Sequence, residues 1–133
     1  MDAIPRGQVR ASRVCGAIAA LFLIADSAGK LLACEPVVKG TTELGYPESL
    51  VRVLGVLQLV CVAVYLVPRT SMLGAILLTG YLGGAVATHV RIGNPLLSHV
   101  LFPVYIALLV WGALYLRDAR VRTLVPLRGS SPN

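Results

Sequence analysis

Residues 49–90 read SLVRVLGVLQLVCVAVYLVPRTSMLGAILLTGYLGGAVATHV and form two apolar runs separated by a short turn. Each run is about 20 residues long, which at about 1.5 Å per residue lets a helix cross the hydrocarbon core of a bilayer. The turn PRTS, residues 68–71, ends the first run with proline and offers hydroxyl side chains that can cap the second. The stretch therefore predicts two antiparallel membrane-spanning helices, at residues 49–67 and 71–90.

Two more apolar runs flank this pair, at residues 14–33 and 97–116. The sequence RIGNP separates the third run from the fourth. The connection at residues 34–48 contains two prolines and two glycines, and it is long enough for a short cap but too short for a separate domain. We therefore predict an all-α polytopic membrane protein, an antiparallel bundle of four transmembrane helices within residues 14–116.

The composition supports this class. The chain has 133 residues, of which 56% are hydrophobic and only 14% charged, whereas about a quarter of the residues of a soluble domain are charged. The three cysteines, Cys15, Cys34 and Cys61, form no CxxC motif and no metal-ligand spacing. This argues against a disulfide scaffold, a zinc site and a thioredoxin-like motif, so we predict no metal site. From the apolar composition, we expect the lipid bilayer as a partner.

The net charge of +6 is concentrated at the ends of the chain. Residues 1–13 contribute +2, Arg69 contributes +1 and residues 117–133 contribute +3, while the other charges cancel. Because Lys and Arg in short loops resist translocation, both tails are predicted to be cytoplasmic, in the inner membrane of a bacterium. The excess charge is then an orientation signal, and no nucleic-acid partner is predicted, since no polar face with interleaved aromatic residues is present.

One alternative concerns the N-terminus. The arginines, the apolar stretch and the sequence LLAC at residues 31–34 resemble a lipoprotein signal whose cysteine is acylated after cleavage. Cleavage there would remove the first span and leave three. Asp26 and Lys30 interrupt the apolar stretch directly before that point, which argues against this interpretation.

Glycines in the spans predict where helices pack, because small residues let helix backbones approach closely in a membrane. We expect the packing positions to be Gly55, Gly80, Gly83 and Gly84.

Aromatic residues fall into two groups by depth. Tyr65, Trp111 and Tyr115 lie near the cytoplasmic ends of their spans and are typical of an interfacial belt. Tyr81 and Tyr105 lie near mid-span, where a phenol needs a hydrogen-bond partner, so both are expected to face the bundle interior.

Polar side chains collect in the outer half of the predicted bundle, because every span carries its ionisable or strongly polar residues towards that side. A pocket there, apolar below and polar at its rim, would suit a small amphiphilic ligand such as a quinone head group. The candidate ligand-binding residues are Asp26, Lys30, Arg52, Gln58, Tyr81, His89 and His99.

These candidates also have simpler interpretations. Asp26 and Lys30 are four residues apart, so they form either a functional pair inside the membrane or a pair in which the lysine extends to the headgroups. Glu48 and Arg52 repeat this spacing at the mouth of the second span, where an exposed pair is favoured. The two histidines are interpreted as hydrogen-bonding groups rather than metal ligands, since neither has a histidine or carboxylate four residues away on its own helix.

Several short motifs occur in a specific order: DSAGKL at 26–31, LGYP at 44–47, LGVLQL at 54–59, Val67-Pro68 and His89. In this order the chain resembles the DoxX-like family of small four-helix membrane proteins, over roughly residues 13–117. That family is named after a small subunit of an archaeal thiosulfate:quinone oxidoreductase, and more distant members resemble assembly factors.

The resemblance points to Lys30, the segment around Gly55 and His89. Many relatives carry Glu or Lys where this chain has the neutral Gln58. Any mechanism that needs a charge at this position does not carry over.

The resemblance and the polar outer half suggest a redox-associated membrane subunit in which Asp26, Lys30 and His89 bind a quinone-like head group. The sequence has no haem, flavin or iron–sulfur motif, so a partner subunit would have to carry the electrons. The alternative is a non-catalytic assembly or accessory protein for another membrane protein, which docks another helix on Gly80, Gly83 and Gly84. The expected protein partners are other membrane subunits or further copies of the chain in a homo-oligomer. A small-molecule carrier is less favoured, because no inverted repeats or broken helices are visible.

Overall fold

The computed structural model describes residues 3–124. Four long helices make up most of it, and no strand occurs among these residues. The long helices are α1 (Arg6–Leu31), α3 (Val51–Leu66), α4 (Ser71–Arg91) and α5 (Phe102–Arg117). The 3-10 turn η1 (Glu48–Leu50) and the π-helical turn η2 (Leu96–Val100) extend α3 and α5, and all four helices are then long and apolar enough to cross a membrane. The predicted fold class is confirmed.

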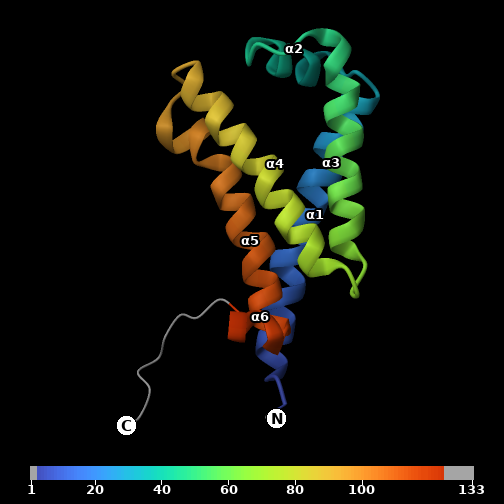
Figure 1. Cartoon of the computed structure of the whole chain (residues 1–133), viewed down its shortest axis with the longest axis vertical. Helices are drawn as coiled ribbons and strands as arrows, with labels where there is room; N and C mark the ends of the chain where they lie inside the picture. Colours follow the sequence, from blue (N-terminus) through green and yellow to red (C-terminus); the bar gives the residue numbers. More distant parts are fainter. Residues whose placement is uncertain (1–2, 125–133) are drawn as a thin grey trace.

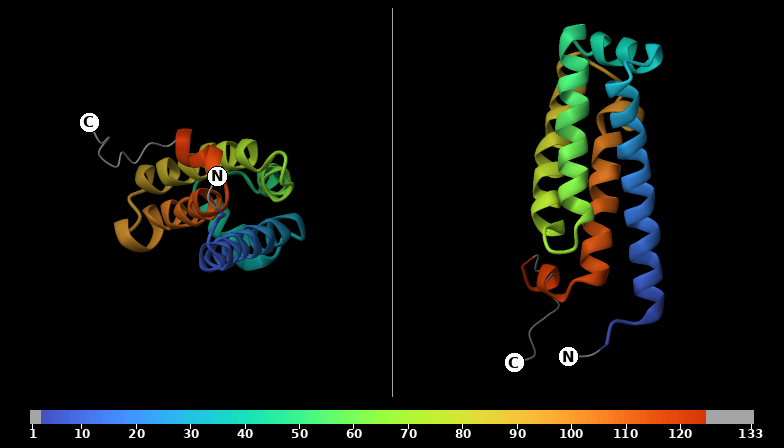
Figure 2. Two further views of the ribbon diagram at one scale, coloured as in Figure 1. Left: turned by 90° about the horizontal axis from the view of Figure 1, so that it is seen from below. Right: turned by 90° about the vertical axis from the view of Figure 1, so that its right-hand side faces the viewer.

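The helices form a ring of neighbours in which α1 packs against α3 and α5, and α4 packs against the same two helices. Figures 1 and 2 show that the turn between α3 and α4 lies at the same end of the bundle as the start of α1. At the opposite end α3 and α4 diverge, and the short helix α2 (Glu35–Glu43) lies across the bundle there.

Both ends of the described chain are more helical than the sequence indicated. Helix α1 begins at Arg6 directly after Pro5, and no further proline separates that arginine from the apolar run. Ser12 fixes this extension by donating a hydrogen bond to the carbonyl of Ala113 at 2.7 Å.

A further helix, α6 (Ala119–Leu124), follows α5. Arg122 anchors it by donating to the carbonyl oxygens of Tyr115 and Leu116, two of the four that the end of α5 leaves without a helical partner. The rest of the second predicted tail lies outside the described residues.

The packing glycines are only partly the expected ones. A Cβ atom at Gly55 would lie 2.8 Å from the Cβ of Lys30, so this glycine does allow α1 and α3 to approach closely. Gly74, which is not among the expected positions, has the same role between α3 and α4, because a Cβ there would overlap the backbone of Tyr65. In contrast, Gly80, Gly83 and Gly84 have no atom within 4 Å of the Cβ position, so their predicted packing role within the bundle is wrong.

Two aromatic predictions are also wrong. Tyr65 is 2% exposed and donates to the carbonyl of Val110 at 3.0 Å, so it is a core residue rather than part of an interfacial belt. Tyr105 is 42% exposed and donates to the carbonyl of Leu97 at 3.2 Å, so its phenol finds a backbone partner without facing the interior. The phenol's need for a partner was correctly expected, but sequence spacing did not show which carbonyl was available.

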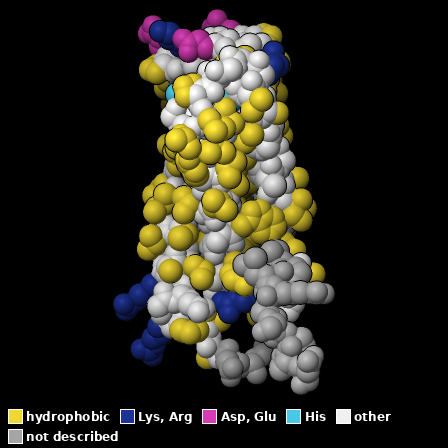
Figure 3. Space-filling model, turned by 90° about the vertical axis from the view of Figure 1, so that its left-hand side faces the viewer, with side chains coloured by type: hydrophobic (Ala, Val, Ile, Leu, Met, Phe, Trp, Pro, Cys, Tyr) yellow, Lys and Arg dark blue, Asp and Glu magenta, His cyan; other side chains and the backbone are white. Residues whose placement is uncertain are grey.

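The surface agrees with a membrane-spanning bundle (Figure 3). Hydrophobic side chains cover the middle of the face shown, while carboxylates together with Lys or Arg lie at the α2 end and only Lys and Arg appear at the other end. Leucine, isoleucine and valine side chains that are half exposed or more occur on all four long helices, as expected for contact with lipid. The chain is therefore a membrane protein whose environment is the lipid bilayer.

Candidate functional site

A cavity of about 720 Å³ occupies the half of the bundle beneath α2. Its walls come from α1, α3, α4 and the start of α5, and α2 forms its roof through Pro36, Val37, Gly40 and Thr41. The cavity lies where α3 and α4 diverge, so the geometry of the bundle itself creates the space.

A hydrogen-bonded network from three helices lines this cavity. Lys30 of α1 forms an ion pair with Asp26 one turn earlier, and its Nζ also donates to Oε1 of Gln58 on α3 at 2.9 Å. Tyr81 of α4 donates to the same oxygen at 3.0 Å. The amide nitrogen of Gln58 donates to the carbonyl of Leu23 at 3.1 Å, so the glutamine side chain joins all three helices.

The network decides how Lys30 is oriented. Lys30 is 9% exposed and its ammonium points to Gln58 in the bundle interior, not to the lipid headgroups. The close approach at Gly55 brings α3 next to Lys30, and Gln58 follows Gly55 by about one helical turn on the same face. The local sequence therefore positions a neutral acceptor where it meets the ammonium.

Two histidines lie at the rim of the cavity. The rings of His89, from the end of α4, and His99, from η2, have centroids 6.0 Å apart in an edge-to-face arrangement. Asn94 lies 2.7 Å from Nδ1 of His89, and the Ser98 hydroxyl lies 2.7 Å from Nδ1 of His99. Within residues 3–124 no group of three His, Cys, Asp or Glu side chains is placed to hold a metal ion.

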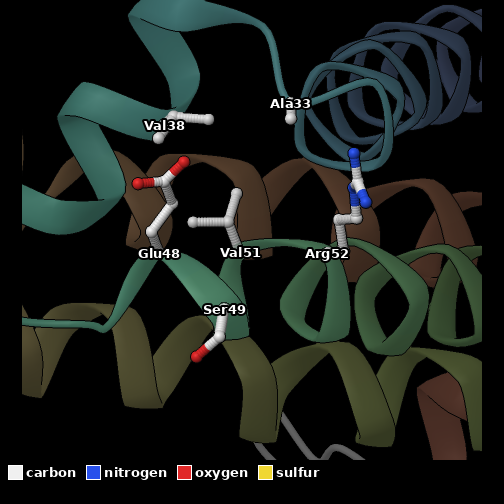
Figure 4. Close-up of a pocket in the computed structure, with 6 residues that line it drawn as sticks. All are labelled: Ala33, Val38, Glu48, Ser49, Val51 and Arg52. Carbon is white, nitrogen blue, oxygen red and sulfur yellow. The ribbon is translucent and has the colours of Figure 1, made fainter.

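Arg52 lies away from this cavity. It lines a smaller hollow of about 340 Å³ with Glu48 and Ala33. Figure 4 shows the Glu48 carboxylate pointing towards Val38 and the Arg52 guanidinium pointing towards Ala33. The predicted Glu48–Arg52 pair is therefore wrong, because Glu48 belongs to the 3-10 turn before α3 and the four-residue spacing of an α-helix does not hold there. The only ion pair in the described part of the chain is Asp26–Lys30.

The structure thus brings six of the seven candidate residues to one cavity: Asp26, Lys30, Gln58, Tyr81, His89 and His99. Gly80 and Gly84, predicted as packing positions, also line it. Without side chains, they leave the α4 wall smooth.

The contacts that hold the roof were not anticipated. Arg91 at the end of α4 donates to the carbonyl of Leu44 after α2 at 2.6 Å, and Tyr46 is 3.3 Å from the hydroxyl of Thr88. Gly45 between them has φ +95°, which a residue with a side chain rarely adopts. The segment LGYP contains the signal for this tight turn, but its partners on α4 are more than 40 residues away and could not be identified from spacing.

Comparisons with known proteins give one result that bears on this site. The model of the DoxX-like family matches residues 14–113, which include all four long helices in whole or in part and every candidate residue named above. No curated protein and no solved structure gives a significant match to the chain.

Proposed function

The chain belongs to the DoxX-like family, and on this premise we propose that it binds a small amphiphilic, quinone-like molecule in the cavity beneath α2. The observation that supports this most directly is the Asp26–Lys30–Gln58–Tyr81 network on the cavity wall. Convergent polar groups beside apolar lining such as Phe22, Leu23 and Leu54 are typical of a site that orients the head group of a ligand.

The rest of the cavity suits the apolar body of such a molecule. Phe22 and Phe102, each 40% exposed, and Leu57, 51% exposed, line the cavity and also belong to the outer surface of the bundle. The cavity is therefore continuous with the surface that faces lipid. An amphiphile dissolved in the bilayer could place its head group at Gln58 and leave its tail among the lipid chains.

The proposed role is that of a redox-associated subunit and not of an electron carrier. Asp26, Lys30 and His89 would bind the head group, while a partner membrane subunit would supply the electron-transferring cofactor, since the sequence has no motif for one. The protein from which the family takes its name is likewise a small subunit of an oxidoreductase.

Gly84→Leu tests the cavity, and Gly83→Leu is its matched control. Both glycines are exposed on α4 with no atom within 4 Å of the Cβ position, but only Gly84 lines the cavity. A leucine at position 84 would fill part of the space and is expected to weaken binding of a decyl-substituted benzoquinone at least about ten-fold, or about 1.4 kcal/mol. The Gly83 variant should bind like the native protein. Isothermal titration calorimetry on the purified chain in detergent measures both affinities.

Equal affinities of the two variants would show that the ligand does not occupy this cavity. If the native protein neither contains a quinone after gentle extraction nor gains thermal stability when one is added, quinone binding is wrong. Co-purification of another membrane protein in that case would favour the assembly or accessory role instead.

We also propose that the protein lies in the inner membrane of a bacterium with both termini in the cytoplasm. The end of the bundle that holds the start of α1, the turn near Arg69 and α6 carries arginines and one acidic residue in its described part, Asp118. This arrangement agrees with the retention of Lys and Arg on the cytoplasmic side. In this orientation α2 and the cavity lie on the periplasmic side of the membrane.

Labelling in intact cells tests the orientation. Cys34 is exposed next to α2, so a membrane-impermeant maleimide is expected to label it without permeabilisation. In a Cys34→Ser background, a cysteine in place of the exposed Thr123 on α6 should react only after the membrane is permeabilised. The opposite pattern would invert the proposed topology.

A further inference from the structure

The Asp26–Lys30–Gln58–Tyr81 network on the cavity wall does not present donors and acceptors equally. The side chain of Lys30 is 11% exposed, whereas that of its partner Asp26 is 31% exposed. The ammonium also has less hydrogen-bonding capacity left for a ligand, because it already donates both to Asp26 and to Gln58. A molecule in the cavity therefore meets the carboxylate more readily than the ammonium.

The other members of the network strengthen this asymmetry. Gln58 is 1% exposed, and its Oε1 already accepts two hydrogen bonds. The Tyr81 hydroxyl donates its hydrogen bond to Gln58, so towards a ligand its oxygen acts as a hydrogen-bond acceptor.

The Asp26 carboxylate can accept further hydrogen bonds. Only its Oδ2 is bonded within residues 3–124, by Lys30, and no buried side-chain oxygen or nitrogen in that range lacks a hydrogen-bond partner. The other oxygen, Oδ1, is thus an accessible acceptor on a residue that lines the cavity. An ionised carboxylate accepts stronger hydrogen bonds than a neutral group, and a low-dielectric site strengthens them further.

From this geometry we infer that the cavity selects a head group that donates a hydrogen bond, a hydroxyl group on an apolar ring, which binds to Oδ1 of Asp26. The inference rests on the proposed function and specifies the chemistry of the head group. For a quinone-like ligand, it means that the dihydroxy form binds more tightly than the dicarbonyl form.

Three probes with the same ring and tail test this inference: decyl-1,4-hydroquinone, its dimethyl ether and decyl-1,4-benzoquinone. Binding of each to the purified full chain in detergent is measured by calorimetry under anaerobic conditions. We expect the hydroquinone to bind about ten-fold more tightly than either other probe, the effect of one hydrogen bond to a charged group. The ether separates loss of the donors from a change in redox state.

Variants of Asp26 test whether its carboxylate causes the preference for the hydroquinone. In Asp26→Asn, which keeps the shape of the side chain but removes its charge, the preference is expected to fall to within about two-fold. In Asp26→Ala, the ammonium of Lys30 keeps Gln58 but loses its ion-pair partner, so it can donate to a carbonyl oxygen and the benzoquinone should become the preferred probe. Glu48→Gln removes a carboxylate outside the cavity and should keep the native preference.

The native protein alone can overturn the inference, so the test does not depend on whether a variant folds. If the ether or the benzoquinone binds as tightly as the hydroquinone, the inferred donor preference is wrong while the proposed function stands. If none of the three probes binds, the proposed function itself is wrong.

Discussion

Gly74→Ala is expected to destabilise the bundle by about 3 kcal/mol, the upper end of the usual cost of overpacking a core. The added methyl group would overlap the backbone nitrogen and Cα of Tyr65, which cannot move away as a flexible side chain can. Helices α3 and α4 would have to separate just after the turn that joins them. The midpoint of SDS-induced unfolding in mixed micelles measures the loss.

Gly83→Ala is the control for this prediction. It adds the same methyl group to the same helix, at a position with no atom within 4 Å. Since alanine favours a helix over glycine by about 1 kcal/mol in water, this variant should be as stable as the native protein or slightly more stable. If Gly74→Ala were as stable as Gly83→Ala, the close approach of α3 and α4 would be contradicted.

Lys30→Met is expected to cost about 1.5–3 kcal/mol of stability, the range for a hydrogen bond to a charged group. Methionine keeps the apolar length of the side chain but leaves the Asp26 carboxylate without its only partner in the described residues. It also removes one of the two donors to Gln58. The same SDS unfolding measurement applies, and binding of the hydroquinone probe should weaken because the network no longer fixes Gln58 and Asp26.

The double variant Asp26→Leu, Lys30→Met separates the ion pair from simple packing. Removing both charges leaves no unpaired carboxylate, so the double variant should be more stable than Lys30→Met alone. A double variant that is no better than the single one would mean that Asp26 is already well solvated and that the pair contributes little.

The long helices could be predicted from sequence because their physical cause is local. A run of about 20 apolar residues between turn residues has few alternatives in a membrane. The extension of α1 to Arg6 and the helix α6 were missed, because their residues are polar and their stability comes from distant partners, Ala113 for Ser12 and the end of α5 for Arg122.

The candidate site could also be predicted only in part from the sequence. Depth along each helix was enough to predict that Asp26, Gln58 and His89 share one half of the bundle, because depth follows from residue number. Rotation about the helix axis does not follow so simply. The spacing of small residues predicts a helix contact at Gly80 and Gly84, which line the cavity instead. Depth alone places Arg52 at the cavity, whereas it lines a separate hollow.

The bonds from Arg91 to Leu44 and between Tyr46 and Thr88 have a mechanical consequence. They fasten the roof of the cavity to the last turn of α4, so the roof moves with that helix and not as a free loop. Transmembrane helices respond to a thinner or thicker bilayer by changing their tilt. Through these two bonds, a change in the tilt of α4 would shift the roof as well. The width of the cavity opening would then depend on the thickness of the surrounding membrane.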